Sequence, residues 1–173
     1  MRKLFVVMMV AFGISSHAQA SLIGDNVQAA VGFNSGPFTV TPASAIVGPG
    51  IEFTVSEAFP AFTVDIDAST ITLVSDVPTS WVPGDFFELT SLNGVGDIIG
   101  FQLLNNGWSG LGVGNISVTP TSLKLDLSGT ANDQTDQVVI TLLFASAIIP
   151  EPATATLGLL SLGGLMLRRR RMA

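Results

Sequence analysis

Carboxylates are the only side chains in the middle of this sequence that could support acid–base or metal chemistry. The single histidine is His17, cysteine and tyrosine are absent, and residues 21–149 contain no arginine. A Ser-His-Asp triad, a Cys-His pair, an ordinary zinc site and an arginine clamp for phosphate are therefore excluded from that region. Only glutamate and aspartate remain as candidates.

Glycoside hydrolysis is one reaction that carboxylates can carry out alone. It needs two carboxyl groups at a defined separation across a cleft, and Glu52, Glu57 and Glu88 are available together with the aspartates. However, these residues fall in or near segments that alternate apolar and polar residues. Alternation in a strand sends acidic side chains to the solvated face. We therefore expect a protein that is not an enzyme.

Calcium binding is the other use of these carboxylates. Asp65 and Asp67 are two residues apart in a predicted strand and so share one face, and oxygen donors also gather at Asn132, Asp133 and Asp136 in a predicted loop. The sequence has no EF-hand loop and no glycine–aspartate repeat. A solvated face or an Asx turn is the competing interpretation. We predict no cofactor, with calcium as the candidate left open.

Two tryptophans raise the question of carbohydrate binding, because an exposed indole can stack on a sugar ring. Core packing is the expected role of at least one of them. Trp108 lies among Asn105, Asn106 and Ser109, so it is the better surface candidate, ahead of Trp81.

The elements that position these groups are predicted to be β-strands. Residues 51–55, 62–66 and 123–127 alternate apolar and polar side chains, which places one face on a core and the other in water. Turn-forming glycine, proline and asparagine separate the segments. Further strands are predicted at residues 38–41, 70–74, 86–90, 98–104, 113–119 and 137–144. The pattern predicts an all-β fold, an antiparallel β-sandwich or jelly-roll-like ectodomain.

The last predicted strand has its own signature. Val139 and Leu143 break its alternation, which predicts a central strand buried on both faces. The polar residues 128–137 before it are expected to form a hairpin or a crossover loop.

The N-terminus has the features of a secretory signal peptide. Arg2 and Lys3 form a positive region, residues 4–14 are apolar, and Ala18-Gln19-Ala20 supplies small residues at Ala18 and Ala20 for cleavage. A first transmembrane helix is the alternative, but the apolar run is short for one. We expect a signal peptide at residues 1–20 and a mature chain that begins near Ser21.

Export would leave a strongly acidic domain. Residues 21–149 contain twelve acidic residues and one base, Lys124, which gives a net charge of about −11. Such a surface repels nucleic acid, and it repels anionic polysaccharide unless divalent cations bridge the two. We therefore expect no nucleic-acid partner. The length suits one domain with its own core.

The C-terminus combines a proline-flanked glutamate, an apolar run and a basic end. Residues 153–167 would make a helix of about 22 Å, short of the ~30 Å hydrocarbon core of a bilayer. Arginine side chains extend such a span by snorkelling, and basic residues favour the cytoplasmic side, so the preceding domain should face outward. The arginines are Arg168, Arg169, Arg170 and Arg171.

In this order, Pro150-Glu151-Pro152, the leucine- and glycine-rich run and the terminal arginines resemble the PEP-CTERM sorting signal. The resemblance covers about 25 residues, 150–173, and its apolar run is short for the family. It implies recognition by exosortase, a membrane cysteine protease or transpeptidase of Gram-negative bacteria that make exopolysaccharide. The alternative is a plain tail-anchor helix.

These signals predict an exported, non-enzymatic protein of the cell surface or extracellular matrix. By the resemblance, its partners are exosortase and exopolysaccharide, and its C-terminal helix holds it in the inner membrane before processing. A carbohydrate- or calcium-binding module displayed at the cell surface is the alternative function.

Overall fold

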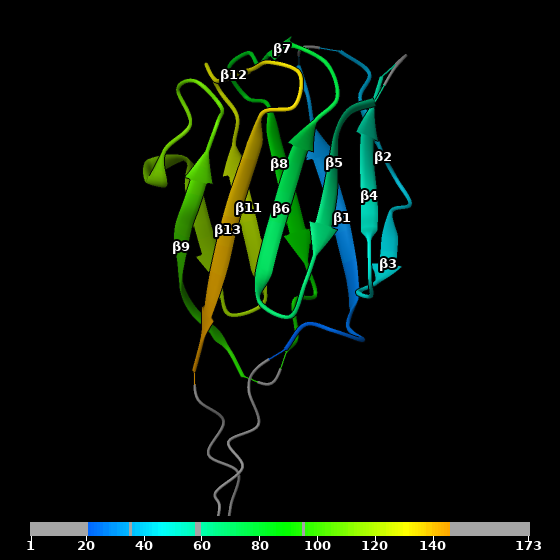
Figure 1. Ribbon diagram of the computed structural model, residues 1–173, viewed down its shortest axis with the longest axis vertical. Helices are drawn as coiled ribbons and strands as arrows, with labels where there is room; N and C mark the ends of the chain where they lie inside the picture. Colours follow the sequence, from blue (N-terminus) through cyan, green and yellow to red (C-terminus); the bar gives the residue numbers. More distant parts are fainter. Residues whose placement is uncertain (1–20, 35, 58–59, 95, 146–173) are drawn as a thin grey trace, which may run out of the picture. The chain divides into compact units, whose positions relative to one another are not determined.

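Two antiparallel β-sheets face each other across an apolar core (Figure 1). The computed structural model describes residues 21–34, 36–57, 60–94 and 96–145, all within one compact unit. The prediction of an all-β, sandwich-like fold is therefore confirmed for this region. No helix among these residues is long and apolar enough to cross a bilayer. The helix predicted at residues 153–167 lies outside the described residues.

The first sheet has five strands in the order β10-β11-β8-β1-β3. They are β1 (Asn26–Gly32), β3 (Ser44–Ile46), β8 (Phe86–Thr90), β10 (Ile116–Thr119) and β11 (Ser122–Asp126). The second sheet has six strands in the order β2-β4-β5-β6-β13-β9. They are β2 (Thr39–Thr41), β4 (Ile51–Ser56), β5 (Pro60–Ile66), β6 (Thr70–Ser75), β9 (Ile98–Asn106) and β13 (Gln137–Phe144). A separate ribbon pairs β7 (Thr79–Ser80) with β12 (Ala131–Asn132).

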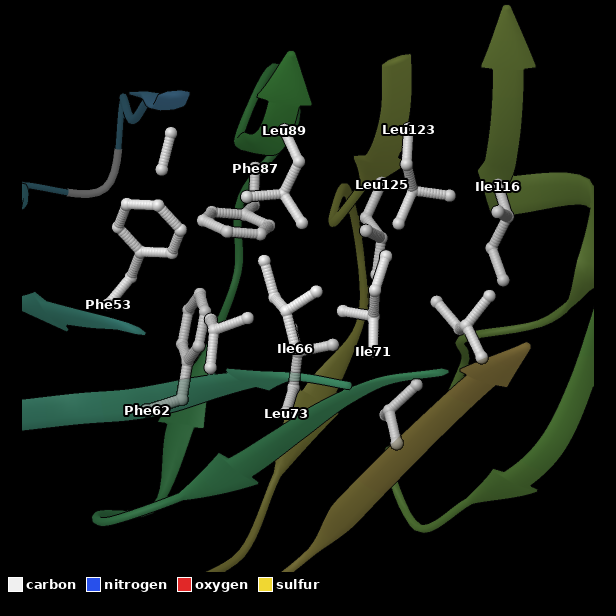
Figure 2. Close-up of a cluster of buried hydrophobic side chains, with 14 of the residues drawn as sticks. Phe53, Phe62, Ile66, Ile71, Leu73, Phe87, Leu89, Ile116, Leu123 and Leu125 are labelled. Atoms are coloured by element: carbon white, nitrogen blue, oxygen red, sulfur yellow. The ribbon is translucent and has the colours of Figure 1, made fainter. Parts of the chain in front are cut away.

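Alternation along the strands builds the core. In β5, Phe62, Val64 and Ile66 are fully buried, whereas Thr63 and Asp65 between them are half-buried. Phe87 and Leu89 of β8 do the same from the opposite sheet. Figure 2 shows Phe62 and Ile66 of one sheet facing Phe87 and Leu89 of the other. Because both sheets contribute to one core, neither is stable without the other.

Two details of the predicted strands are corrected. Residues 113–115 form a short 3₁₀ turn (η1, Val113–Asn115) instead of a strand. Two hydrogen bonds close this turn: Gly112 N–H donates to Asn115 Oδ1 at 3.0 Å, and Asn115 N–H donates to Gly112 O at 3.0 Å. β13 is internal, between β6 and β9, as predicted. However, Leu143 is 39% exposed, so burial on both faces is wrong there.

Both ends of the described domain pack at the same end of the sandwich (Figure 1). Leu22 N–H donates to Ala68 O at 2.7 Å, and Ala145 N–H donates to Asp97 O at 2.8 Å. Gly94 lies between them: a Cβ on this residue would be 3.0 Å from Ser21 O and 3.4 Å from the Phe144 ring. The chain therefore enters and leaves the sandwich at the same end, and a side chain at residue 94 would be tightly packed between the two ends.

Candidate functional site

The β7–β12 ribbon forms the other end of the sandwich. β13 runs from Gln137, beside this ribbon, to Phe144, beside Gly94, which is about 23 Å at 3.3 Å per residue (Figure 1). Main-chain bonds hold the ribbon in place. Trp81 N–H donates to Thr130 O at 2.9 Å, and Ser109 and Ala131 exchange bonds of 2.8 and 2.9 Å.

An open pocket of about 270 Å³ lies against this ribbon. Its walls are mainly small and polar, and several supply a hydroxyl, amide or carboxylate group. The lining residues are Pro78, Thr79, Ser80, Gly107, Ser109, Ala131, Asn132, Asp133 and Asp136. All come from β7, β12 and the segments beside them, so segments far apart in sequence supply one polar surface.

The three oxygen-donor residues expected to act together do reach this pocket. Asn132 is buried, accepts a bond from Trp81 Nε1 (2.9 Å) at its Oδ1 and donates Nδ2 to Val77 O (2.9 Å). Asp136 Oδ2 accepts the main-chain N–H of Asp133 at 2.7 Å, and Asp136 N–H returns a bond to Asp133 O at 3.2 Å. One oxygen of this group therefore closes a turn, while the Asp133 side chain is exposed.

The geometry can offer several oxygen atoms to a hydroxylated ligand or a cation. Calcium takes six to eight oxygens, including main-chain and amide oxygens. Within residues 21–34, 36–57, 60–94 and 96–145, no three His, Cys, Asp or Glu side chains are grouped closely enough to hold a metal ion. Hydroxyl and amide groups from the chain, or water, would have to complete any coordination sphere here.

Trp108 does not provide a surface platform, contrary to the expectation from its polar neighbours. Its side chain is 1% exposed, and its ring stacks on Trp81 with centroids 6.2 Å apart and packs edge-on against Phe62 at 5.5 Å. Gly107 N–H donates to Gln137 O at 2.8 Å, which turns the chain back onto β13 and carries the indole into the core. Trp81 is also buried, at 3% exposed.

The second predicted carboxylate pair lies elsewhere. Asp65 is on the outer face of β5, opposite Thr72 of β6, and so belongs to a different part of the fold from the pocket. Burial, and then the negative charge of Asp67, raise the pKa of Asp65. The repulsion agrees with the prediction that both carboxylates share one face.

The glutamates considered for hydrolysis have separate environments. Glu52 is buried near the beginning of β4, with Oε1 accepting from Gly48 N–H at 2.9 Å and Oε2 from Ile66 N–H at 2.7 Å. Glu88 lies in the opposite sheet, on β8, paired across the strands with Lys124. Glu57 is exposed just after β4. Glu52 therefore has a structural role that the alternation of residues 51–55 did not predict.

The sequence did not indicate Thr79, Ser80 or Ser109 as site residues. β7 and β12 are two residues long, too short for alternation to be visible. The turn residues around Pro78 were the only available signal. The predicted signal-cleavage residues Ala18 and Ala20, the sorting motif Pro150-Glu151-Pro152 and the terminal arginines all lie outside the described residues.

Comparison of the chain with protein-family models, with curated proteins and with solved structures finds no match. The function must therefore be argued from the residues and the geometry of this chain.

Proposed function

We propose that this protein is an exported, non-enzymatic protein of the cell surface or extracellular matrix, whose C-terminal signal is processed by exosortase. The observation that carries the proposal is the fixed order of Pro150-Glu151-Pro152, an apolar run and four arginines at the C-terminus. In this proposal the host is a Gram-negative bacterium, and the protein associates with exopolysaccharide after processing.

The domain boundaries support this arrangement. The first described main-chain bond is made by Leu22 and the last by Ala145. The predicted signal-peptide cleavage after Ala20 and the sorting motif at residues 150–152 both fall just outside these positions. Removal of either segment would therefore leave the described hydrogen bonds and the core in place.

The deciding experiment is the intact mass and terminal peptides of the protein isolated from its host, compared with a Glu151→Ala variant. We expect the parent chain to begin near Ser21 and to end between Pro150 and Ala153, and the variant to keep Ala173. Glu57→Ala is the matched control, since it makes the same change at an exposed glutamate outside the sorting motif and should leave processing unchanged. A parent chain that still ends at Ala173 would mean that the C-terminal segment is only a membrane anchor, and the sorting proposal would be withdrawn.

A carbohydrate- or calcium-binding module is the second candidate. It is favoured by the pocket, which brings Asn132, Asp133 and Asp136 together with three hydroxyl-bearing side chains. Binding of a polysaccharide that carries negative charge would need a bridging cation, because the domain itself is acidic.

Calorimetry tests this candidate directly. The protein is titrated with calcium, with host polysaccharide, and with polysaccharide in the presence of calcium. Asp133→Asn should weaken binding, whereas Asp97→Asn, at an exposed aspartate outside the pocket, should not. Silence in all three titrations would eliminate the binding-module function and leave the sorting proposal untouched.

A further inference from the structure

We propose that the free edge of β9 is a self-association surface, which pairs with β9 of a second copy of this chain to form one continuous antiparallel sheet. The inference rests on β9 and its neighbours alone. It holds whether or not the C-terminal signal is processed.

β9 is the longest edge strand among the described residues. It has nine residues, it is the last strand of its sheet, and its only strand partner is β13. Ile98 N–H donates to Pro120 O at 3.0 Å, and within residues 21–34, 36–57, 60–94 and 96–145 no strand pairs with residues 99–106 on the side away from β13. The other edge strands, β2, β3 and β10, have three or four residues. Natural edges are usually kept short or blocked by charge, proline or β-bulges. β9 contains no charge and no proline, and its two register shifts leave Gly100–Leu103 as a regular stretch.

Both sides of β9 present apolar surface. Ile99 and Leu104 are 68% and 63% exposed. On the inner side, Phe101 and Leu103 pack against the core but remain half-buried, because the sheet ends at this strand. A partner that covers this edge must therefore be an extended strand that is uncharged and apolar on both sides.

A second β9 has these properties. Antiparallel pairing centred on Gln102 sets Phe101 opposite Leu103 of the other copy, which extends both cores across the seam. Just beyond the regular stretch, it brings the exposed Leu104 close to Gly100 of the other copy, a residue without a side chain. No charged residue lies along the seam, although each domain carries a net charge of about −11. Repulsion between the two domains should therefore make pairing stronger as salt is added.

Two features keep the seam short. The pairing of β9 with β13 shifts register between Val139 and Ile140 and again between Leu143 and Phe144, so the regular stretch of β9 is Gly100–Leu103. We therefore expect reversible association at high local concentration. The two-fold axis also reverses one copy, so the two Ala145 ends lie at opposite ends of the pair. Such a pair would link two opposed surfaces instead of two neighbours on one surface.

Single-cysteine cross-linking tests the register, because the chain has no cysteine of its own. Gln102→Cys would place two thiols directly opposite, where antiparallel Cα atoms are about 4.5–5.5 Å apart, within the range of a disulfide. Ser117→Cys is the matched control, since Ser117 is exposed on another edge strand, β10. Both variants are made in the full chain, purified in detergent and oxidised over a range of protein and salt concentrations.

We expect a disulfide dimer from Gln102→Cys that increases with salt, and no comparable dimer from Ser117→Cys. Adding Leu104→Lys to Gln102→Cys should abolish the dimer, and sedimentation of the parent chain should show salt-promoted association. Equal cross-linking of Gln102→Cys and Ser117→Cys would overturn the proposal. The absence of a Gln102→Cys dimer would do the same, provided that the introduced thiol reacts freely with a maleimide. So would pairing of this edge with a different protein in place of a second copy.

Discussion

Glu52 shows how a carboxylate can serve the fold instead of a reaction. Its two oxygens pair the N–H groups of Gly48 and Ile66, and its side chain is only 7% exposed. Glu52→Ala leaves both amides without an acceptor, so we expect it to lower the free energy of unfolding by about 3 kcal/mol. Urea unfolding of the variant would measure this. Glu57→Ala, at an exposed glutamate, should change stability by no more than about 0.5 kcal/mol.

Asp65 gives stability a defined pH dependence. Because folding raises its pKa, through burial and then the charge of Asp67, the folded chain holds this proton more tightly than the unfolded chain. Its contribution is full below the ordinary value of 3.8 and is lost as pH rises through the raised pKa. At pH values above the raised pKa, Asp65→Asn should therefore be more stable than the parent chain. Urea unfolding midpoints measured across a pH series test this.

Asp126 supplies the control of opposite sign. Hydrogen bonds from Ser128, including Ser128 N–H to Oδ1 at 3.0 Å, lower the pKa of Asp126. Its contribution is present above the ordinary value of 3.8 and is lost as pH falls through the lowered pKa. Asp126→Asn should therefore lose stability most at neutral pH. Parallel pH profiles for the two variants would contradict both assignments.

The two Asn-Gly pairs, at residues 93–94 and 106–107, should deamidate at different rates. Deamidation requires the N–H nitrogen of the glycine to attack the asparagine side chain and release ammonia. Gly107 N–H is bonded to Gln137 O at 2.8 Å, and Asn106 Nδ2 to Leu111 O at 2.7 Å, so this pair is held. Asn93 is exposed in the loop before Gly94. Peptide mapping after incubation at mildly alkaline pH should show conversion at Asn93 first, and equal rates in urea.

At the scale of elements, the β7–β12 ribbon depends on one indole. Trp81 Nε1 donates to Asn132 Oδ1, whereas Trp108 Nε1 is buried without a partner. Trp81→Phe leaves the buried Asn132 oxygen unpaired and should cost about 1–2 kcal/mol more than Trp108→Phe. Thermal unfolding of both variants measures the difference. Equal losses would mean that ring packing alone holds the ribbon.

Alternation predicted the elements that are long enough to show it. Residues 62–66 and 86–90 were identified because Phe62, Val64, Phe87 and Leu89 recur every second position and face one core. β1 was missed because Ala29 and Ala30 interrupt its apolar signal, although pairing with both β3 and β8 places it inside a sheet. The β-propensity of single residues does not include the stabilisation that a strand gains from pairing with its neighbours.

The candidate site was predicted only in part, for a similar reason. Asn132, Asp133 and Asp136 could be grouped because they are close in sequence. Ser80 and Ser109 join them only through pairings to Ala131, which bring segments tens of residues apart into register. Trp108 was assigned to the surface because its neighbours are polar, but one glycine turn between it and β9 sends the ring inward. Local composition carries no information on such a turn.

At the scale of the whole molecule, the two ends of the sandwich have separate roles. At one end, Gly94 packs close to Ser21 O and the Phe144 ring. The β7–β12 ribbon and its pocket form the other end. If the chain is held by its C-terminus, the end of the sandwich at Gly94 is the end from which the chain continues toward the anchor. Only residues 146–149 then separate the last described main-chain bond, at Ala145, from the sorting motif.

That short spacing makes a prediction about processing. Four residues reach at most about 14 Å when fully extended, so a protease that acts on residues 150–152 must work close to the folded domain. Deleting residues 146–149 should therefore reduce cleavage in the host, while inserting a Gly-Ser segment of the same length should leave it equal or faster. C-terminal peptide mass measures both. Deletion with no loss of cleavage would contradict the prediction unless the last residues of β13 separate from the sheet to supply the missing length, which hydrogen exchange at Leu143 and Phe144 would detect.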